Sequence, residues 1–340
     1  MTLTNLSFLA RAIGAVLLIA SSGAAFADCT SVDTSRGTLT AKHVASKNET
    51  VSGDVDATGC EIGVYIPKGV KNVTVSATVH DANQIGVFNN GNAKIDGSDI
   101  YNTGHHNGTV FEPNGSQTGI GVYFFDATGA VSNSNIYNYQ KGGIVINGLS
   151  SANVTDNLVT GADPVSYIAQ NGIQFGYGAR GNAMRNTVTG NWYTGNDWAS
   201  TGILVFETGG VTVNGNTVQT SQMGIAIEAW CYLMASADNN QVVNNTVFGS
   251  EWGVSIAAYS LSWSTCDASS DNNKVTNNLI DSTGGAGDAG ISIGAGPFGG
   301  SDTPTADNNK LIRNTIRGFT TDIDQWGDDT STKVHANVIE

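Results

Sequence analysis

Short stretches of alternating apolar and polar residues recur along most of the chain. In the segment 201–227, Gly202 precedes apolar residues at Ile203 and Val205, a polar stretch follows, and a new round opens at Gly224, 22 residues after the first. The stretches are rich in β-branched residues, and their period of two is that of a strand rather than a helix. The pattern therefore predicts many short β-strands in a repeating unit.

Each unit follows one template: Gly-Ile-x-(Ile/Val/Phe), a gap, an apolar residue, two residues, Asn or Ser, one residue, and a second apolar residue. The glycines of the template are Gly119, Gly143, Gly172, Gly202, Gly224, Gly253 and Gly290. The Asn position is held by Ser98, Ser134, Asn157, Asn186, Asn216, Asn245, Asn278, Asn314 and Asn337. Asn suits a turn because it tolerates the left-handed conformation, and stacked amides can hydrogen-bond to one another.

Self-similarity of this kind marks a stacked array in which each unit buries its apolar face against its neighbours. The shortest unit is long enough for three short strands and three turns. The sequence thus predicts an all-β chain forming a single-stranded right-handed parallel β-helix, a solenoid of roughly ten coils with an N-terminal cap.

The repeats resemble those of the pectin-lyase-like superfamily, and the resemblance covers residues from about Ile62 to the C-terminus. It implies a carbohydrate-active or surface protein. The scaffold carries lyases, epimerases, glycosidases, adhesins and spacers alike, so the activity has to be argued from individual residues.

The first 27 residues have the features of a secretory signal peptide, with Arg11 before an apolar run and small residues up to Ala27. The run is too short to span a bilayer, so no membrane insertion is expected after cleavage. We expect residues 28–92 to form the cap and first coils, and 93–340 the repeat region. Four cysteines in an exported chain favour disulfides, and their positions predict the pairs Cys29–Cys60 and Cys231–Cys266. The expected location is secreted or periplasmic.

The formal net charge of −14 makes nucleic acid an unsuitable partner. It also counts against a long polyanion, unless a local basic strip or a bridging cation is present. We expect a monomer that binds a polysaccharide.

Loop lengths vary along the repeat, and insertions in solenoids mark the faces that bind. The template glycine and the next Asn are 14 positions apart at Gly202 and Asn216 but 25 positions apart at Gly253 and Asn278. Early coils carry their extra residues before the Gly-Ile strand, and late coils carry them after it. The sheet of Gly-Ile strands is therefore predicted to be walled on opposite edges in its two halves, which makes a groove.

Residues at the second and fourth positions after each glycine should face this groove. Aromatic and amide side chains there and on the walls are candidates for sugar binding: Tyr123, Asn147, Gln174, Trp192, Trp198, Phe206 and Trp230. Trp263 is a further wall candidate. Candidate catalytic residues are Glu228, Glu207, Asp197, Tyr177 and Arg180.

These candidates allow two chemistries. A glycosidase needs two carboxyl groups about 5 to 9.5 Å apart, which pairs among Glu207, Glu228 and Asp197 would supply. A lyase or epimerase needs a base and a positive group or Ca²⁺ beside a uronate, for which Tyr177 and Arg180 are candidates.

Lys141 and the tandem histidines His105 and His106 are weaker candidates for the lyase or epimerase chemistry. The paired-aspartate motif of polygalacturonases is absent, and Asp163-Pro164-Val165 lacks the histidine of mannuronan epimerases. No cofactor is required by any motif, and Ca²⁺ remains the one candidate. The alternative hypothesis is a non-catalytic glycan-binding surface or matrix protein of the adhesin type.

Overall fold

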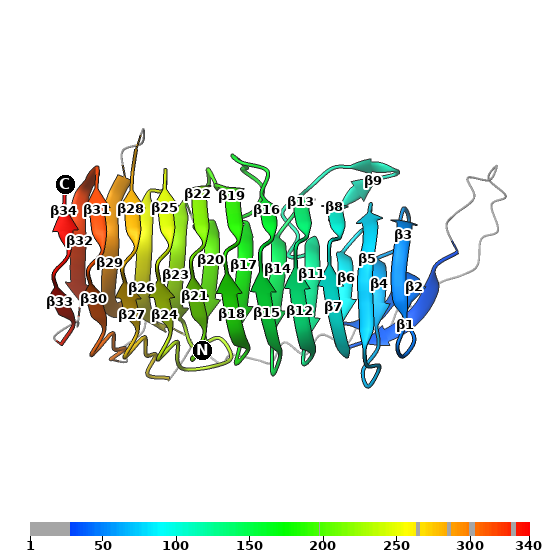
Figure 1. The fold of residues 1–340 in the computed structure, drawn as a ribbon, viewed down its shortest axis with the longest axis horizontal. Coiled ribbons are helices and arrows are strands. Elements are labelled where there is room, and N and C mark those ends of the chain that lie inside the picture. Colours follow the sequence, from blue (N-terminus) through cyan, green and yellow to red (C-terminus); the bar gives the residue numbers. More distant parts are fainter. Residues whose placement is uncertain (1–27, 197, 263–265, 284–286, 299–302, 328–330) are drawn as a thin grey trace, which may run out of the picture.

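The computed structural model describes residues 28–196, 198–262, 266–283, 287–298, 303–327 and 331–340, which wind into an elongated stack of coils (Figure 1). Two long sheets run along the stack, and no helix occurs among the described residues. Accordingly, the described part of the chain holds no helix that is long and apolar enough to cross a membrane. The predicted all-β parallel helix is confirmed.

The first sheet, sheet A, contains the Gly-Ile strands. Its order is β1 (Thr30–Thr34), β2 (Gly37–Val44), β4 (Ile62–Ile66), β6 (Ile85–Asn89), β11 (Ile120–Phe125), β14 (Gly142–Asn147), β17 (Asn171–Gly176), β20 (Thr201–Phe206), β23 (Met223–Ala229), β26 (Trp252–Leu261), β29 (Gly287–Phe298) and β32 (Phe319–Gly327). All neighbours pair in parallel except β1 and β2, which pair antiparallel at the N-terminal end.

The second sheet, sheet B, forms the other two sides of the coils. One side has β3 (Thr50–Asp56), β5 (Val73–His80), β7 (Asn92–Asp96), β12 (Thr128–Ser132), β15 (Ser151–Thr155), β18 (Arg180–Met184), β21 (Thr212–Asn214), β24 (Gln241–Val243), β27 (Lys274–Thr276), β30 (Lys310–Ile312) and β33 (Lys333–His335). The other has β8 (Asp99–Thr103), β13 (Asn135–Tyr139), β16 (Leu158–Thr160), β19 (Thr187–Asn191), β22 (Thr217–Ser221), β25 (Thr246–Phe248), β28 (Leu279–Asp281), β31 (Thr315–Arg317) and β34 (Val338–Ile339). A small hairpin, β9 (His106–Asn107) with β10 (Val110–Phe111), lies outside both sheets.

A column of glycines runs through sheet A because the coils approach closely there. A Cβ on Gly63, Gly86, Gly121, Gly143, Gly172, Gly202, Gly224 or Gly253 would lie only 2.5–2.8 Å from the carbonyl oxygen of the next glycine in the column. The predicted register was wrong at one coil, since Gly121 and not Gly119 is in register between Gly86 and Gly143. Gly119 instead takes a positive φ of 87° before the strand.

The predicted Asn ladder exists and is hydrogen-bonded from coil to coil. The Asn157 side-chain amide donates to Asn186 Oδ1 at 2.9 Å and to the carbonyl oxygen of Val131 at 3.0 Å, and the same pattern repeats up to Asn337. The expected left-handed conformation belongs to the preceding residue, as at Asp156 with φ of 59°. Asn is therefore used for its buried amide, which satisfies backbone groups at the turn.

Both predicted disulfides are present. Cys29–Cys60 ties the antiparallel β1 region to the first coils, and Cys231–Cys266 joins two long loops that follow β23 and β26. The interior is filled by stacked Ile and Val side chains such as Ile203, Ile225 and Val254, which have no exposed surface. Each such burial stabilises the coil by about 1.5–3 kcal/mol.

Candidate functional site

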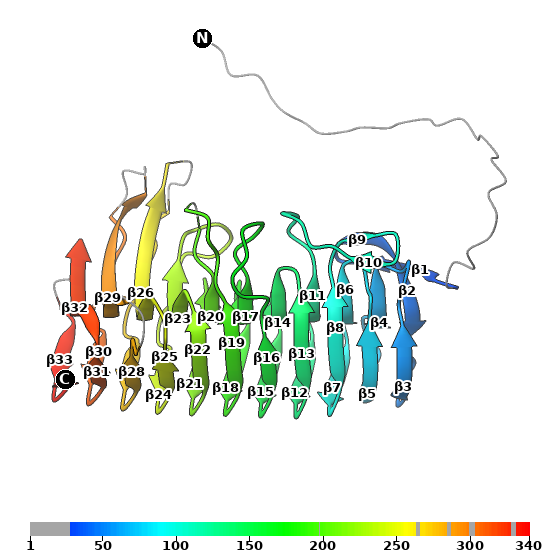
Figure 2. The same ribbon diagram turned by 90° about the horizontal axis from the view of Figure 1, so that it is seen from above.

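An elongated groove of about 910 Å³ lies over the outer face of sheet A. Its floor is formed by the outward residues of β11 to β29, as the alternation predicted, among them Val145, Leu204 and Ser255. Loop residues of the early coils, including Asn196 and Trp198, form part of its border, and Trp230 and Tyr232 of a late-coil loop form another part. Figures 1 and 2 show these longer loops extending beyond the regular body of the stack.

The half of the groove nearer the N-terminus is polar. Asn171 Nδ2 donates to Gln174 Oε1 at 3.0 Å, and Gln174 Nε2 donates to Asn147 Oδ1 at 3.1 Å, so three amides form a band across two coils. Tyr123 continues this side of the floor, with the Arg36 guanidinium 5.7 Å from its ring centroid.

Lys141 adds a buried positive charge to the same half. Its Nζ donates to the carbonyl oxygen of Ala169 at 2.6 Å, and burial lowers the pKa of Lys141 to about 8. The side chain lines the groove, so at neutral pH an ammonium group is presented next to the amide band. An anionic group on a ligand would be attracted to this half.

The half nearer the C-terminus is aromatic, and its rings surround the carboxylate of Glu228. Trp230 Nε1 donates to Glu228 Oε2 at 3.0 Å. The indole of Trp230 also lies 5.8 Å from that of Trp198 and 4.3 Å from the ring of Tyr259, measured between centroids. Phe298 closes the cluster, 5.3 Å from Trp230.

Burial raises the pKa of Glu228 to about 6, against the opposing effect of the Trp230 hydrogen bond. The side chain is only partly covered and lines the groove, so a ligand can reach it. A carboxyl group with a pKa of this size exchanges protons readily near neutral pH, which is what a general acid or base requires.

Tyr177 also lines the groove, two coils before Glu228. It follows Gly176, which is in register with Phe206, and Phe206 is in register with Glu228. Two inter-strand steps place their backbones about 10 Å apart. Burial, with the charge of Glu207, raises the pKa of Tyr177 to about 12, so the phenol keeps its proton at neutral pH.

Glu207, expected to share catalysis with Glu228, is fully buried and holds a loop. Its carboxylate accepts hydrogen bonds from the backbone amides of Tyr232, Leu233 and Met234, at 2.5, 2.8 and 3.0 Å. With both oxygens occupied, and outside the residues that line the groove, Glu207 is placed for a structural role.

Arg180 does not join Tyr177 in the groove. It is exposed at the start of β18 and borders a smaller cavity of about 440 Å³, which Glu207 also lines. The structure therefore does not bring these two predicted residues together in the groove.

The sugar-binding candidates divide between the groove and its surroundings. Tyr123, Asn147, Gln174, Trp198, Phe206 and Trp230 line the groove. Trp192 does not: it is half-buried, and its carbonyl oxygen accepts the amide of Val165. Asp197 and Trp263 lie outside the described residues.

Sequence reasoning missed Glu251, a second carboxylate that lines the groove. Burial raises its pKa, and its Oε2 accepts a hydrogen bond from Gln222 Nε2 at 3.3 Å. Glu251 directly precedes Trp252, and Trp252 is in register with Met223 on the neighbouring strand. Met223 lies five positions before Glu228. The two carboxylates thus lie at opposite edges of the sheet, about 20 Å apart along the strand direction.

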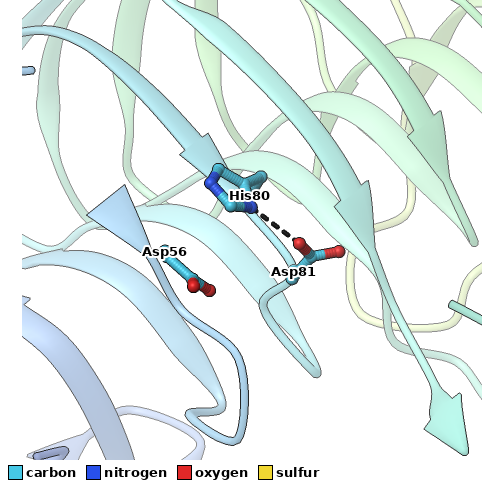
Figure 3. A group of neighbouring side chains, drawn as sticks. All are labelled: Asp56, His80 and Asp81. Carbon is cyan, nitrogen blue, oxygen red and sulfur yellow. Dashed lines mark hydrogen bonds and ion pairs between the residues drawn. The ribbon is translucent and has the colours of Figure 1, made fainter. Parts of the chain in front are cut away.

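No three metal-ligating side chains converge among the described groove residues. The group with suitable spacing is Asp56, His80 and Asp81, which belongs to sheet B and its following turn (Figure 3).

Comparison with known proteins supports the fold. A family model described as "Right handed beta helix region" matches residues 118–265. The solved structure of the periplasmic alginate epimerase AlgG is similar, with a TM-score of 0.51 at 10% identity over 87% of this chain and 78% of that chain. A variant of AlgG gives a TM-score of 0.54 at 11% identity over the same shares.

The A-module of the Azotobacter vinelandii mannuronan C-5 epimerase AlgE6 gives a TM-score of 0.49 at 14% identity, over 82% of this chain and 68% of that chain. No curated protein matches the chain. The coil stacking, the family model and the AlgG structures agree on the architecture: the chain is a right-handed parallel β-helix with a pectate-lyase-like fold.

Proposed function

We propose that this protein binds an extended polysaccharide along the groove of sheet A and transfers protons to and from one sugar ring, as a polysaccharide lyase or epimerase does. The observation that carries the proposal is Glu228, a ligand-accessible carboxyl group whose pKa burial raises to about 6 beside an indole. Groups with strongly perturbed pKa values in a cleft are favoured candidates for proton transfer.

The length of the groove favours a chain over a single sugar. Its lining extends from β11 to β29, which is six inter-strand steps or roughly 29 Å. Aromatic faces such as that of Trp198, 51% exposed, suit the apolar faces of sugar rings, and amides suit their hydroxyl groups.

The boundary between the two halves of the groove suits a uronate ring. Asn147, Gly176, Phe206 and Glu228 form one row across four adjacent strands. The row spans three inter-strand steps, about 14 Å. A uronate ring whose C–H face meets Phe206 and Glu228 would have its carboxylate directed along the row, toward the amides and the field of Lys141. Positive potential on the carboxylate side is what the developing enolate needs.

Glu228 would then act as the base that takes the proton next to the carboxylate, and Tyr177 as the acid. If Tyr177 gives its proton to the glycosidic oxygen, that bond breaks and an unsaturated sugar remains. If Tyr177 instead donates its own proton to the carbon that Glu228 deprotonated, from the opposite face, the sugar is epimerised. Both outcomes use one base and one acid, and epimerisation requires that the two lie on opposite sides of the ring.

The similarity in fold to proteins named alginate epimerases supports a polysaccharide as substrate. The two disulfides and the signal-like residues 1–27 support an extracytoplasmic location, either secreted or periplasmic.

A non-catalytic glycan-binding protein is the second candidate, and the Trp230 hydrogen bond to Glu228 is what favours it, since that bond also serves to hold the indole in place. To separate the two, we would incubate the protein with neutral and acidic polysaccharides in deuterated water. Unsaturated products or deuterium at the epimerised carbon support the proposal. Saturated products of hydrolysis, or binding without any product, would contradict it.

A further inference from the structure

A cluster of histidine and aspartate side chains lies on sheet B, away from the groove. Asp56 ends β3 and is in register with His80, which ends β5, and Asp81 follows in the turn. One potential ligand atom from each of the three lies within 4.8 Å of the others (Figure 3). None of the three lines the groove or the smaller cavity beside Arg180.

The histidine and aspartate side chains contact one another through atoms of the types that bind metal ions, and Asp56 and Asp81 also accept hydrogen bonds from Thr58 and Asn102. His80 Nδ1 lies 2.6 Å from Asp81 Oδ2, and His80 Nε2 lies 3.2 Å from Asp54 Oδ1. His106 approaches from the β9 hairpin, its Nε2 3.4 Å from Asp81 Oδ1. Two imidazoles and three carboxylates thus converge on one region.

The surroundings hold these groups in place. The ring of His80 stacks on Tyr101 with centroids 5.1 Å apart and planes 7° from parallel. The side chain of His106 is only 2% exposed, and its Nδ1 lies 2.9 Å from the carbonyl oxygen of Gly104. A ligand imidazole whose second nitrogen contacts a backbone carbonyl is typical of metal sites.

We propose that Asp56, His80 and Asp81 bind a divalent transition-metal ion of the Zn²⁺ type, with Asp54 and His106 available to complete the shell. Imidazole together with carboxylate suits Zn²⁺ and its neighbours, whereas Ca²⁺ takes six to eight oxygen ligands. Tetrahedral ligands about 2.1 Å from zinc are about 3.4 Å apart. Ligand atoms that lie up to 4.8 Å apart would therefore close by up to about 1.4 Å, and His80 Nδ1 would move away from Asp81 Oδ2, which now lies at 2.6 Å.

The bound ion would connect strands β3 and β5, and through His106 the β9 hairpin, to one another. Metal bound only in the folded state stabilises it by an amount that grows with the logarithm of its affinity and concentration. The hairpin begins the long loop that reaches the groove at Gln117, so the site would stabilise the N-terminal part of the stack.

The test uses the full mature chain, stripped with a chelator and titrated with ZnCl₂ by calorimetry, with Tm measured in parallel. We expect one Zn²⁺ per chain and a rise in Tm, and CaCl₂ at equal concentration should give neither. His80→Ala should weaken binding at least tenfold. His43→Ala is the matched control, because His43 pairs with Glu49 outside the cluster and should leave binding unchanged.

Asp56→Asn provides a second variant at an exposed strand end, in case His80→Ala fails to fold. It should also weaken Zn²⁺ binding while leaving the Tm of the metal-free protein nearly unchanged. The proposal is overturned if the native chain does not bind Zn²⁺, or if His80→Ala and Asp56→Asn bind it as the native chain does. In either case the contacts are hydrogen bonds that hold the turn.

Discussion

The two halves of the groove share one floor but offer different chemistry. In the N-terminal half, polar side chains hydrogen-bond to one another, as in the band Asn171–Gln174–Asn147, and Lys141 lies beside them. The C-terminal half surrounds Glu228 with aromatic rings, so that burial raises the pKa of its carboxyl group. A repeating backbone can thus place recognition and reactivity on neighbouring coils by changing only outward residues and loops.

The largest effect is expected from removing the carboxylate of Glu228, which would abolish the proposed reactivity of the aromatic half. Glu228→Gln should lower turnover of the acidic polysaccharide by about 10³-fold or more, because the amide cannot accept the proton. The measurement is the initial rate of product formation at saturating substrate. Glu251→Gln, which changes a carboxylate at the opposite edge, is the control and should retain most of the rate.

Stability supplies an independent check on this variant. Because the folded-state pKa of Glu228 is raised above its unfolded value, the native chain loses stability relative to Glu228→Gln as the pH rises from about 4.5 to about 6. The difference in the free energy of unfolding should reach about 2 kcal/mol at most. Equal pH dependence of the two proteins would contradict the raised pKa.

Removal of the proposed acid, Tyr177, tests whether the reaction uses a group outside the aromatic cluster together with Glu228. Tyr177→Phe keeps the ring that contacts Phe206 edge-on, 5.5 Å between centroids, and removes only the hydroxyl group. We expect kcat to fall about 10²-fold with KM nearly unchanged. A change confined to KM would make Tyr177 a binding residue instead.

The polar half should control selectivity for charge. Lys141→Gln should weaken binding of an acidic polysaccharide about tenfold and of a neutral one hardly at all. In the native protein, affinity for the acidic chain should fall as the pH rises through about 8, where Lys141 loses its proton. Isothermal titration across this pH range, at constant salt, measures both effects.

The smallest effect is expected at the exposed indole on the wall. Trp198→Ala should weaken glycan binding about fivefold, by removing one stacking surface. Trp192→Ala in the same loop region is the matched control, because Trp192 does not line the groove. Equal losses for the two variants would mean that the loop, and not the ring of Trp198, matters.

The fold was predictable because its repeat is imposed by backbone contacts that few residues satisfy. Only glycine fits where a Cβ would meet the next coil, and the buried amides of the Asn ladder satisfy turn carbonyls such as that of Val131. The register error arose because Gly119 is followed by Ile120 and Val122, as the template requires, whereas the glycine in register, Gly121, is followed by Val122 and Phe124.

The site residues were predictable only within strands, where alternation decides to which face of the sheet each side chain points. Phe206 and Glu228 follow that rule and face the groove. Glu207 comes just after a strand and has a φ of 50°, so strand alternation does not apply to it. Its hydrogen-bond partners are backbone amides of a loop distant in the sequence, and such contacts leave no pattern in the sequence. Glu251 lies before its strand begins, where alternation says nothing.

The most direct test of the account is the pH dependence of turnover by the native protein. If Glu228 is the base, kcat should rise along a limb with an apparent pKa of about 6, and this limb should be absent from the residual activity of Glu228→Gln. A rate that falls through pH 6, or a rising limb that persists unchanged in the variant, would contradict the assignment.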